Sequence, residues 1–185
     1  ERDAYLRALY NTLFNLVIQE NYFPMLLFCT EESMLHRIDE LTETGIIDGY
    51  IIITRAFNEE ADKKFRKLLI PRVYVHYFSR YSLESINMVD TDQFLGGFLA
   101  TKHLIQLGHR HIAAFTSVGR EFEDRTSGYF AALREAGLPT DNKNVFTIPR
   151  SYDGGYRMIM DNQKIIHHYT GIFVQNDPSA IGCIN

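Results

Sequence analysis

The side chain best suited to bind a small polar molecule in this chain is an arginine at the start of a predicted helix. Arg125 follows the loop after an apolar strand predicted over His111–Thr116, and Phe122 lies on the same inner side of that helix. A guanidinium presents a rigid fork of donors to hydroxyl, carboxylate or phosphate oxygens. The alternative is a surface arginine that pairs with Asp124 or Glu121.

Two further polar side chains follow the next apolar strand, predicted over Gly171–Gln175. Asn176 and Asp177 come directly after it and precede Pro178. Such a pair either turns inward and offers hydrogen-bonding groups to a polyhydroxylated ligand, or caps the helix that the proline begins. We expect capping for one of the two.

A third candidate lies near the middle of the chain. Asp90 and Asp92 precede a helix predicted to begin at Gln93, and either could accept hydrogen bonds from ligand hydroxyls or cap that helix. In open parallel sheets, ligands bind at the carboxyl ends of the strands, where residues of this kind gather. The predicted ligand-binding set is Arg125, Asn176, Asp177 and Asp92.

Other chemistries find little support. The seven histidines include His109 with His111 and the adjacent His167 and His168, but no Cys or carboxylate completes a metal-ligand spacing. No nucleophile elbow, dinucleotide-binding loop or Walker loop occurs, and Gly96 and Gly97 are better explained by close helix packing. We therefore predict no catalytic residues, no metal and no cofactor, and the chain is not expected to be an enzyme.

The composition narrows the range of partners and compartments. The 185 residues are 45% hydrophobic and carry a formal charge of −4, which is enough for a core but gives no basic surface for nucleic acid. No apolar run is long enough to span a membrane. The only cysteines, Cys29 and Cys183, indicate two buried thiols in a reducing compartment, so a cytoplasmic location is expected.

The first half of the chain alternates strands and helices. An amphipathic helix over Tyr5–Val17 precedes a buried strand over Met25–Thr30, and Ser33 is a plausible N-cap of the next helix. Further strands are predicted over 50–54, 73–77 and 86–89, with a charged helix from about Asn58 to Leu69. This order predicts a parallel sheet.

The second half repeats the alternation. Helices are predicted over 93–107, 122–136 and 155–166, with strands over 111–116, 145–148 and 171–175, and a last helix at Pro178. Two successive units of similar size indicate two lobes with a switch near residues 90–92. The fold class is α/β.

The residues Val89 to Phe115, VDTDQFLGGFLATKHLIQLGHRHIAAF, resemble a signature of the LacI/GalR family of transcription regulators. An aspartate precedes a glycine-containing helix that ends in Leu-Gly-His-Arg before a strand. Four shorter matches agree in order and spacing: Ile47-Asp48-Gly49-Tyr50, Ile70-Pro71-Arg72-Val73, Arg125-Thr126-Ser127-Gly128-Tyr129 and Asn176-Asp177-Pro178-Ser179-Ala180-Ile181-Gly182.

The resemblance implies a two-lobed periplasmic-binding-protein-like fold, each lobe a parallel sheet flanked by helices. Residues 1–91 would form the first lobe and 92–185 the second, with the first strand, the last strands and the DNA-binding domain expected outside this chain. Arg125 matches the family's cleft arginine, and the resemblance gives Asn176 a ligand role and leaves Asp177 structural or shared.

The function implied is that of a sensor. A small polar effector, sugar-like by expectation, would bind between the lobes of a homodimer and control operator DNA binding by an N-terminal helix-turn-helix. The alternative is a periplasmic sugar-binding protein of an ABC transporter. The sequence LGHRHI at residues 107–112 and the unpaired cysteines speak against that alternative.

Overall fold

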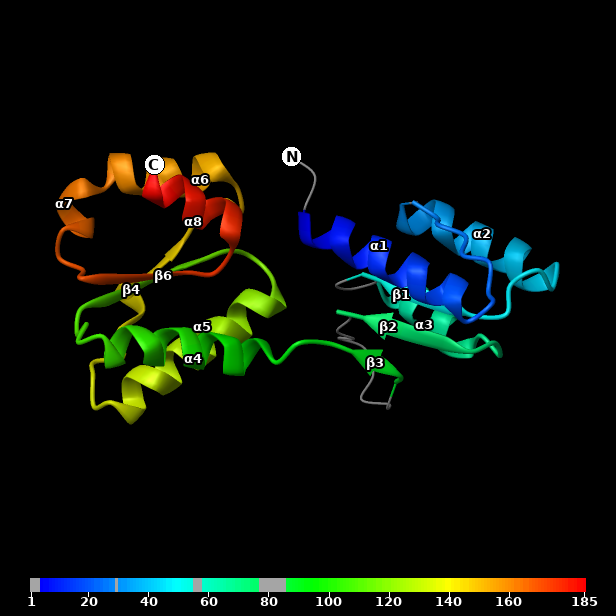
Figure 1. Cartoon of the computed structure of the whole chain (residues 1–185), viewed down its shortest axis with the longest axis horizontal. Coiled ribbons are helices and arrows are strands. Elements are labelled where there is room, and N and C mark those ends of the chain that lie inside the picture. The colour runs from blue at the N-terminus through cyan, green and yellow to red at the C-terminus, as the bar shows by residue number, and fades with distance from the viewer. Residues whose placement is uncertain (1–3, 29, 55–57, 77–85) are drawn as a thin grey trace. The chain divides into compact units, whose positions relative to one another are not determined.

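The computed structural model describes residues 4–28, 30–54, 58–76 and 86–185 of the chain. The chain divides into two compact units, Glu1–Asn87 and Met88–Asn185 (Figure 1). This division falls slightly ahead of the boundary between residues 91 and 92 that the sequence predicts. The described residues form two sheets of three strands each, with parallel pairing of the strands whose register is known.

The first unit is built on strands β1 (Tyr50–Ile53) and β2 (Arg72–Val75), which pair in parallel, and the sheet order is β1-β2-β3 with β3 at Met88–Val89. The helices are α1 (Ala4–Gln19), α2 (Glu31–Glu43) and α3 (Glu59–Lys67). Ile38 of α2 and Phe65 of α3 form a common core with Ile52 and Tyr74 of the strands. Helices α2 and α3 therefore cover the sheet together.

Local sequence fixes the ends of these helices. The side-chain oxygen of Asn58 accepts a hydrogen bond from the backbone N–H of Ala61 at 2.8 Å, as an N-cap does, which confirms the predicted start of α3. Helix α2 begins earlier than predicted, because Thr30 and not Ser33 is its N-cap.

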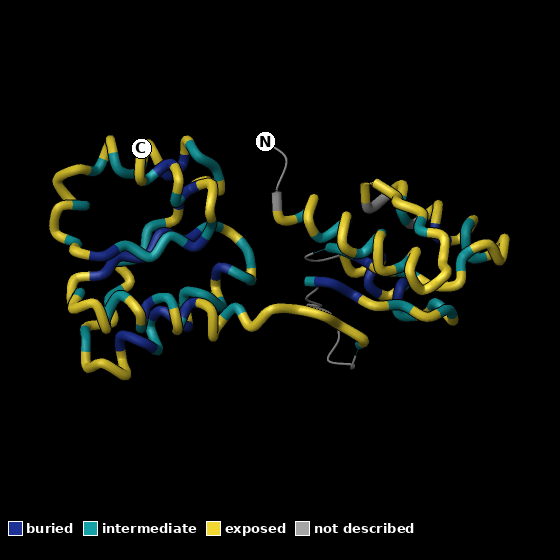
Figure 2. Tube along the Cα trace, in the orientation of Figure 1, coloured by how far each residue is buried: buried dark blue, intermediate teal, exposed yellow. Residues whose placement is uncertain are grey.

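The second unit has the strand order β5-β4-β6, with β4 (Ile112–Thr116) in the centre between β5 (Val145–Thr147) and β6 (Gly171–Val174). Figure 1 shows α4 (Gln93–Gln106) and α5 (Arg120–Glu135) on one side of this sheet and α6 (Tyr152–Asp161), α7 (Gln163–Ile166) and α8 (Asp177–Ile184) on the other. A short 3-10 helix, η1 (Asn142–Asn144), precedes β5. All five residues of β4 are buried, as Figure 2 shows.

Glycines allow the helix pairs of this unit to approach closely. A Cβ on Gly97 of α4 would lie 2.0 Å from the carbonyl oxygen of Arg125 of α5, and one on Gly128 of α5 would lie 2.0 Å from that of Phe94 of α4. The prediction of close packing is confirmed for Gly97 but not for Gly96, which has nothing within 4 Å. Gly108 ends α4 with a φ of 96°, as its predicted left-handed cap requires.

One predicted element was wrong, and two others have different bounds from those predicted. Residues 25–28 and Thr30 form no strand, and the side chain of Phe28 is 75% exposed, while Cys29 lies outside the described residues. The fourth strand is limited to Met88–Val89. The helix predicted over 155–166 begins at Tyr152 and is divided at Asn162 into α6 and α7.

Within the described residues, no helix combines the length and the apolar character needed to cross a membrane. Cys183 is half-buried, and burial raises the pKa of its thiol.

Candidate functional site

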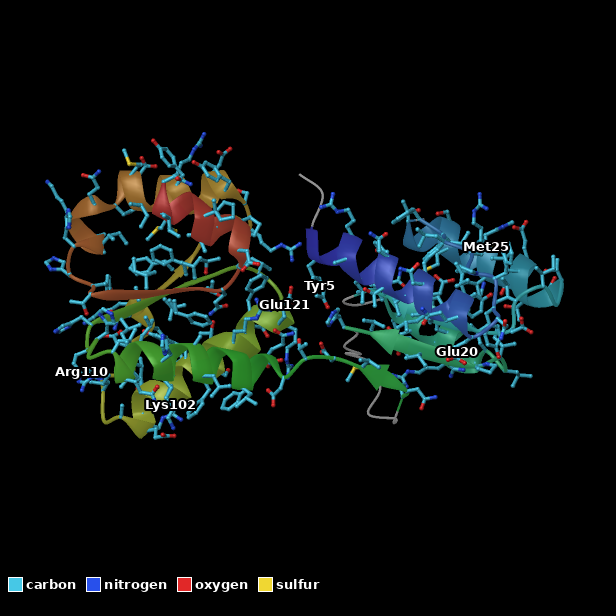
Figure 3. The ribbon with its side chains drawn as sticks, viewed as in Figure 1. Tyr5, Glu20, Met25, Lys102, Arg110 and Glu121 are labelled. Carbon is cyan, nitrogen blue, oxygen red and sulfur yellow. The ribbon has the colours of Figure 1, made fainter. Side chains whose placement is uncertain are left out.

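The predicted ligand residues of the second unit gather at the carboxyl ends of its strands. Helices α5 and α8 begin there, directly after β4 and β6. In Figure 3, Glu121 at the start of α5 marks this edge, and Arg110, which precedes β4, marks the opposite edge. The carboxyl edge of a parallel sheet is the usual place for a ligand in such a fold, because the loops that follow the strands converge there.

Arg125 lies in the second turn of α5 and contacts Gln93, Gln175 and Phe122. Its Nε–H donates to Oε1 of Gln93 at 2.7 Å, and its Nη1 donates to the backbone carbonyl of Gln175. The guanidinium lies 5.5 Å from the centre of the Phe122 ring, within the range of a cation–π contact. These contacts fix the plane of the fork, and Gln93 is in turn bound to the hydroxyl of Thr91.

The alternative partners that the sequence suggested for Arg125 are bound by other arginines. The Nε–H of Arg120 donates to both carboxylate oxygens of Asp124, at 3.0 and 3.1 Å. Arg150 lies 3.8 Å from the carboxylate of Glu121. The guanidinium of Arg125 binds an amide side chain and a backbone carbonyl and lies over an aromatic ring.

A ring of three side chains lies beside Arg125. The hydroxyl of Thr116, the last residue of β4, donates to Oε1 of Gln175 at 3.0 Å, and Nε2 of Gln175 donates to the hydroxyl of Thr126 at 2.9 Å. The hydroxyl of Thr126 returns to that of Thr116 at 3.3 Å. Each of the three groups both donates and accepts, so the ring is closed.

Sequence reasoning missed Gln93 and this ring. The sequence predicts Gln175 only as the end of an apolar strand and Gln93 only as the first residue of a helix. One signal was available, because a glutamine that ends an otherwise apolar strand is a polar group at a core position and needs buried partners.

Asn176 and Asp177 have different positions at the start of α8. Oδ1 of Asn176 accepts from the backbone N–H of Ser179 at 3.1 Å, so Asn176 is the N-cap, whereas Asp177 is exposed in the first turn. The Nδ2 group of Asn176 is buried and has no hydrogen-bond partner. One amide therefore has its oxygen committed to the helix and its donor unused.

Asp92 is the N-cap of α4, with Oδ1 accepting from the N–H of Leu95 at 2.8 Å, and its side chain is exposed. Asp90 accepts from the N–H of Thr91 at 2.7 Å. Capping by Asp92 is the alternative to ligand binding that the sequence left open.

Arg125 is linked by hydrogen bonds to the residues that adjoin the other three predicted ligand residues in the sequence. Arg125 binds Gln93, which follows Asp92, and it binds the carbonyl of Gln175, which precedes Asn176. The four residues thus belong to one edge of one unit. No group of three or more His, Cys, Asp or Glu side chains in the described parts of the chain could hold a metal ion.

The chain is similar in sequence to known regulators. Residues 101–185 match a family described as a periplasmic binding protein-like domain. The chain is 24% identical over 156 residues to the HTH-type transcriptional repressor PurR of Actinobacillus pleuropneumoniae. The aligned region covers 83% of this chain and 46% of that protein. The chain spans less than half the length of the curated relatives that it matches.

Solved structures of LacI family regulators have a similar fold. A regulatory protein of the LacI family from Chloroflexus aggregans has a TM-score of 0.80 and 26% identity, covering 90% of this chain and 60% of that one. A LacI family transcriptional regulator from Enterococcus faecium with bound ribose has a TM-score of 0.75 and 26% identity, covering 98% of this chain and 66% of that one. The parallel sheets with flanking helices are therefore those of a periplasmic-binding-protein-like fold.

Proposed function

We propose that this chain belongs to the LacI/GalR family of transcription regulators, binds a small polar effector and thereby controls the DNA binding of a regulator. The effector is a sugar or a similarly hydroxylated molecule, for which the ribose-bound relative is a chemical guide. The protein acts as a sensor and not as an enzyme. The regulator works in the cytoplasm as a homodimer and binds operator DNA through a helix-turn-helix.

The observation that carries this proposal is the fixed orientation of Arg125 at the carboxyl edge of the second sheet. Its guanidinium donates to the side chain of Gln93 and to the backbone carbonyl of Gln175, while Asp124 binds Arg120 and Glu121 lies near Arg150. A preoriented fork of donors suits ligand hydroxyls, because less side-chain freedom is lost when the ligand binds.

The unused donor of Asn176 supports the same edge as the binding site. A buried N–H group without a partner costs about 1–3 kcal/mol, so a ligand oxygen that accepts from it would remove a penalty present in the free protein. We propose that Asn176 donates to the ligand while its oxygen keeps capping α8. Asp92 and Asp177 accept from ligand hydroxyls at the exposed rim.

Control of DNA binding requires that the effector bind two states of the regulator with different affinity. A coupling of roughly 1–3 kcal/mol is typical of such linkage. The periplasmic sugar-binding alternative receives no support from the relatives, which are described as transcription regulators.

The test is a ligand screen with an arginine variant and a matched control. Purified protein is titrated with D-ribose, hexoses, disaccharides and nucleobases, and binding is measured by thermal stabilisation and calorimetry. Arg125→Ala should weaken binding of the true ligand at least about tenfold, which corresponds to one lost charge-assisted hydrogen bond. Arg134→Ala, at the far end of the same helix, should leave the affinity unchanged. Full affinity in Arg125→Ala would refute the site, and chemical conversion of the ligand would refute the sensor.

A further inference from the structure

The side chain of Gln175 is almost completely buried, with 3% of its surface exposed, although glutamine is a polar residue. It follows the last residue of β6, and its backbone N–H donates to the carbonyl of Phe115 in β4 at 3.0 Å. Both its backbone and its side chain contact α5. The carbonyl accepts from Arg125, and the amide donates to Thr126, the next residue along the helix.

The ring formed by Thr116, Gln175 and Thr126 joins two strands to one helix. Thr116 ends β4, Gln175 follows β6 and Thr126 lies in α5. Because a buried polar network is stable only when every member is satisfied, removal of one side chain leaves the other two groups with incomplete bonding. The ring therefore resists any rotation of this turn of α5 relative to the strand ends.

The guanidinium of Arg125 is oriented from the same place. An arginine side chain loses up to about 2 kcal/mol of rotamer entropy when it is fixed, so a defined orientation requires several directed contacts. Two of these contacts are hydrogen bonds, to Gln93 and to the carbonyl of Gln175. The direction of the second bond depends on how the backbone of Gln175 is held, and the ring adds a side-chain constraint to the hydrogen bond between its N–H and the carbonyl of Phe115.

We propose that Gln175 is a positioning residue that orients Arg125 for the ligand through the closed ring with Thr116 and Thr126. This inference rests on the proposed function, because Arg125 is a ligand group only there. Gln175 itself does not touch the ligand in this account. Its role is to keep the fork of Arg125 preoriented in the free protein.

The experiment observes Arg125 directly and needs no ligand. The Nε–H signal of Arg125 is assigned in a ¹⁵N NMR spectrum by its loss in Arg125→Lys, and its hydrogen-exchange rate is measured in three further variants. Gln175→Met preserves side-chain length without the amide. Gln163→Met is the matched control, because Gln163 is exposed at the start of α7. Thr126→Val breaks the ring from the α5 side and serves if Gln175→Met fails to fold.

We expect exchange at Nε–H to accelerate about tenfold or more in Gln175→Met and in Thr126→Val, because a guanidinium that loses its fixed orientation is bound to Gln93 for less of the time, and less than about twofold in Gln163→Met. A rate within twofold of the wild type in a folded ring variant would overturn the positioning role. A separate titration with D-ribose and the other sugars of the screen tests the proposed function. If exchange accelerates but no sugar binds, the positioning role stands and the proposed function fails. If a sugar binds but the exchange rate stays within about twofold of the wild type, the proposed function stands and the positioning role fails.

Discussion

The carbonyl oxygen of Arg125 lies 2.0 Å from the position that a Cβ atom on Gly97 would occupy. The helix that carries the proposed ligand arginine is thus in backbone contact with α4. Gln93, which accepts from Arg125, lies one turn before Gly97 on the same helix. Helix α4 therefore packs against the backbone of Arg125 at Gly97 and binds its side chain through Gln93.

Gly97→Ala should destabilise the protein strongly. The added methyl would meet backbone atoms that cannot move independently, and overpacking of this kind costs about 1–3 kcal/mol or more. Chemical denaturation followed by circular dichroism measures the free energy of unfolding.

Gly96→Ala is the matched control for that experiment. Gly96 is the neighbouring residue in the same helix and has nothing within 4 Å of its Cβ position. Replacement of a helical glycine by alanine should stabilise the chain by about 0.5–1 kcal/mol. Equal effects of the two substitutions would contradict the close contact of α4 with α5.

Substitutions of Asn176 should separate its two roles. Asn176→Ala removes the cap of α8 and should lower the free energy of unfolding by about 1 kcal/mol. Asn176→Asp keeps the capping oxygen and should preserve stability, but it lacks the Nδ2 donor. Calorimetry with a ligand from the screen should show weakened binding for both variants. Wild-type affinity in Asn176→Asp would remove Asn176 from the site.

Tyr129 should give the protein a sensitivity to alkaline pH. Its ring is fully buried and its hydroxyl donates to the carbonyl of Ile112 at 2.8 Å. Burial, with a smaller effect of Tyr169, raises the pKa of this phenol well above its ordinary value. In the unfolded chain the phenol ionises near pH 10, so the stability it contributes is complete below about pH 10 and declines above it.

Denaturation at a series of pH values tests this linkage. The free energy of unfolding of the wild type should exceed that of Tyr129→Phe, and this difference should shrink between about pH 9.5 and 11.5. Tyr22→Phe, at a side chain that is 58% exposed, controls for the general effect of high pH. A difference that stays constant over this range would refute the raised pKa.

In the first unit, Asp62 should be the most sensitive charged residue of α3. It is 2% exposed, and its carboxylate accepts from Nε of Arg66 at 2.9 Å. Because removal of one partner leaves a buried charge unpaired, Asp62→Ala should cost about 3–5 kcal/mol. Glu60→Ala, at an exposed position of the same helix, should change the free energy of unfolding by less than about 0.5 kcal/mol. Similar losses in both variants would contradict a buried pair.

The sequence predicted elements whose signals are local. Strands β1, β2, β4 and β6 were found within two residues of their ends, because each is a short apolar run bounded by glycine, proline or polar residues. The caps at Asn58 and Gly108 are also local. The strand over Met25–Thr30 was wrong for a non-local reason, since an apolar run becomes a strand only where another strand pairs with it.

The same distinction applies to the site. The position of Arg125 at the start of a helix could be predicted from spacing, and its contact with Phe122 lies within one turn. Gln93 and Gln175 lie 32 and 50 residues from Arg125 in the sequence, so no local pattern predicts these contacts. The ring formed by Thr116, Gln175 and Thr126 likewise depends on how the strands and α5 meet in space.

The paired glycines Gly97 and Gly128 have a mechanical consequence. Helices in backbone contact cannot slide past one another by rearranging side chains, so α4 and α5 must move as one solid piece. A displacement of α5 at Arg125 is therefore expected to carry with it the first turn of α4, which follows Asp92.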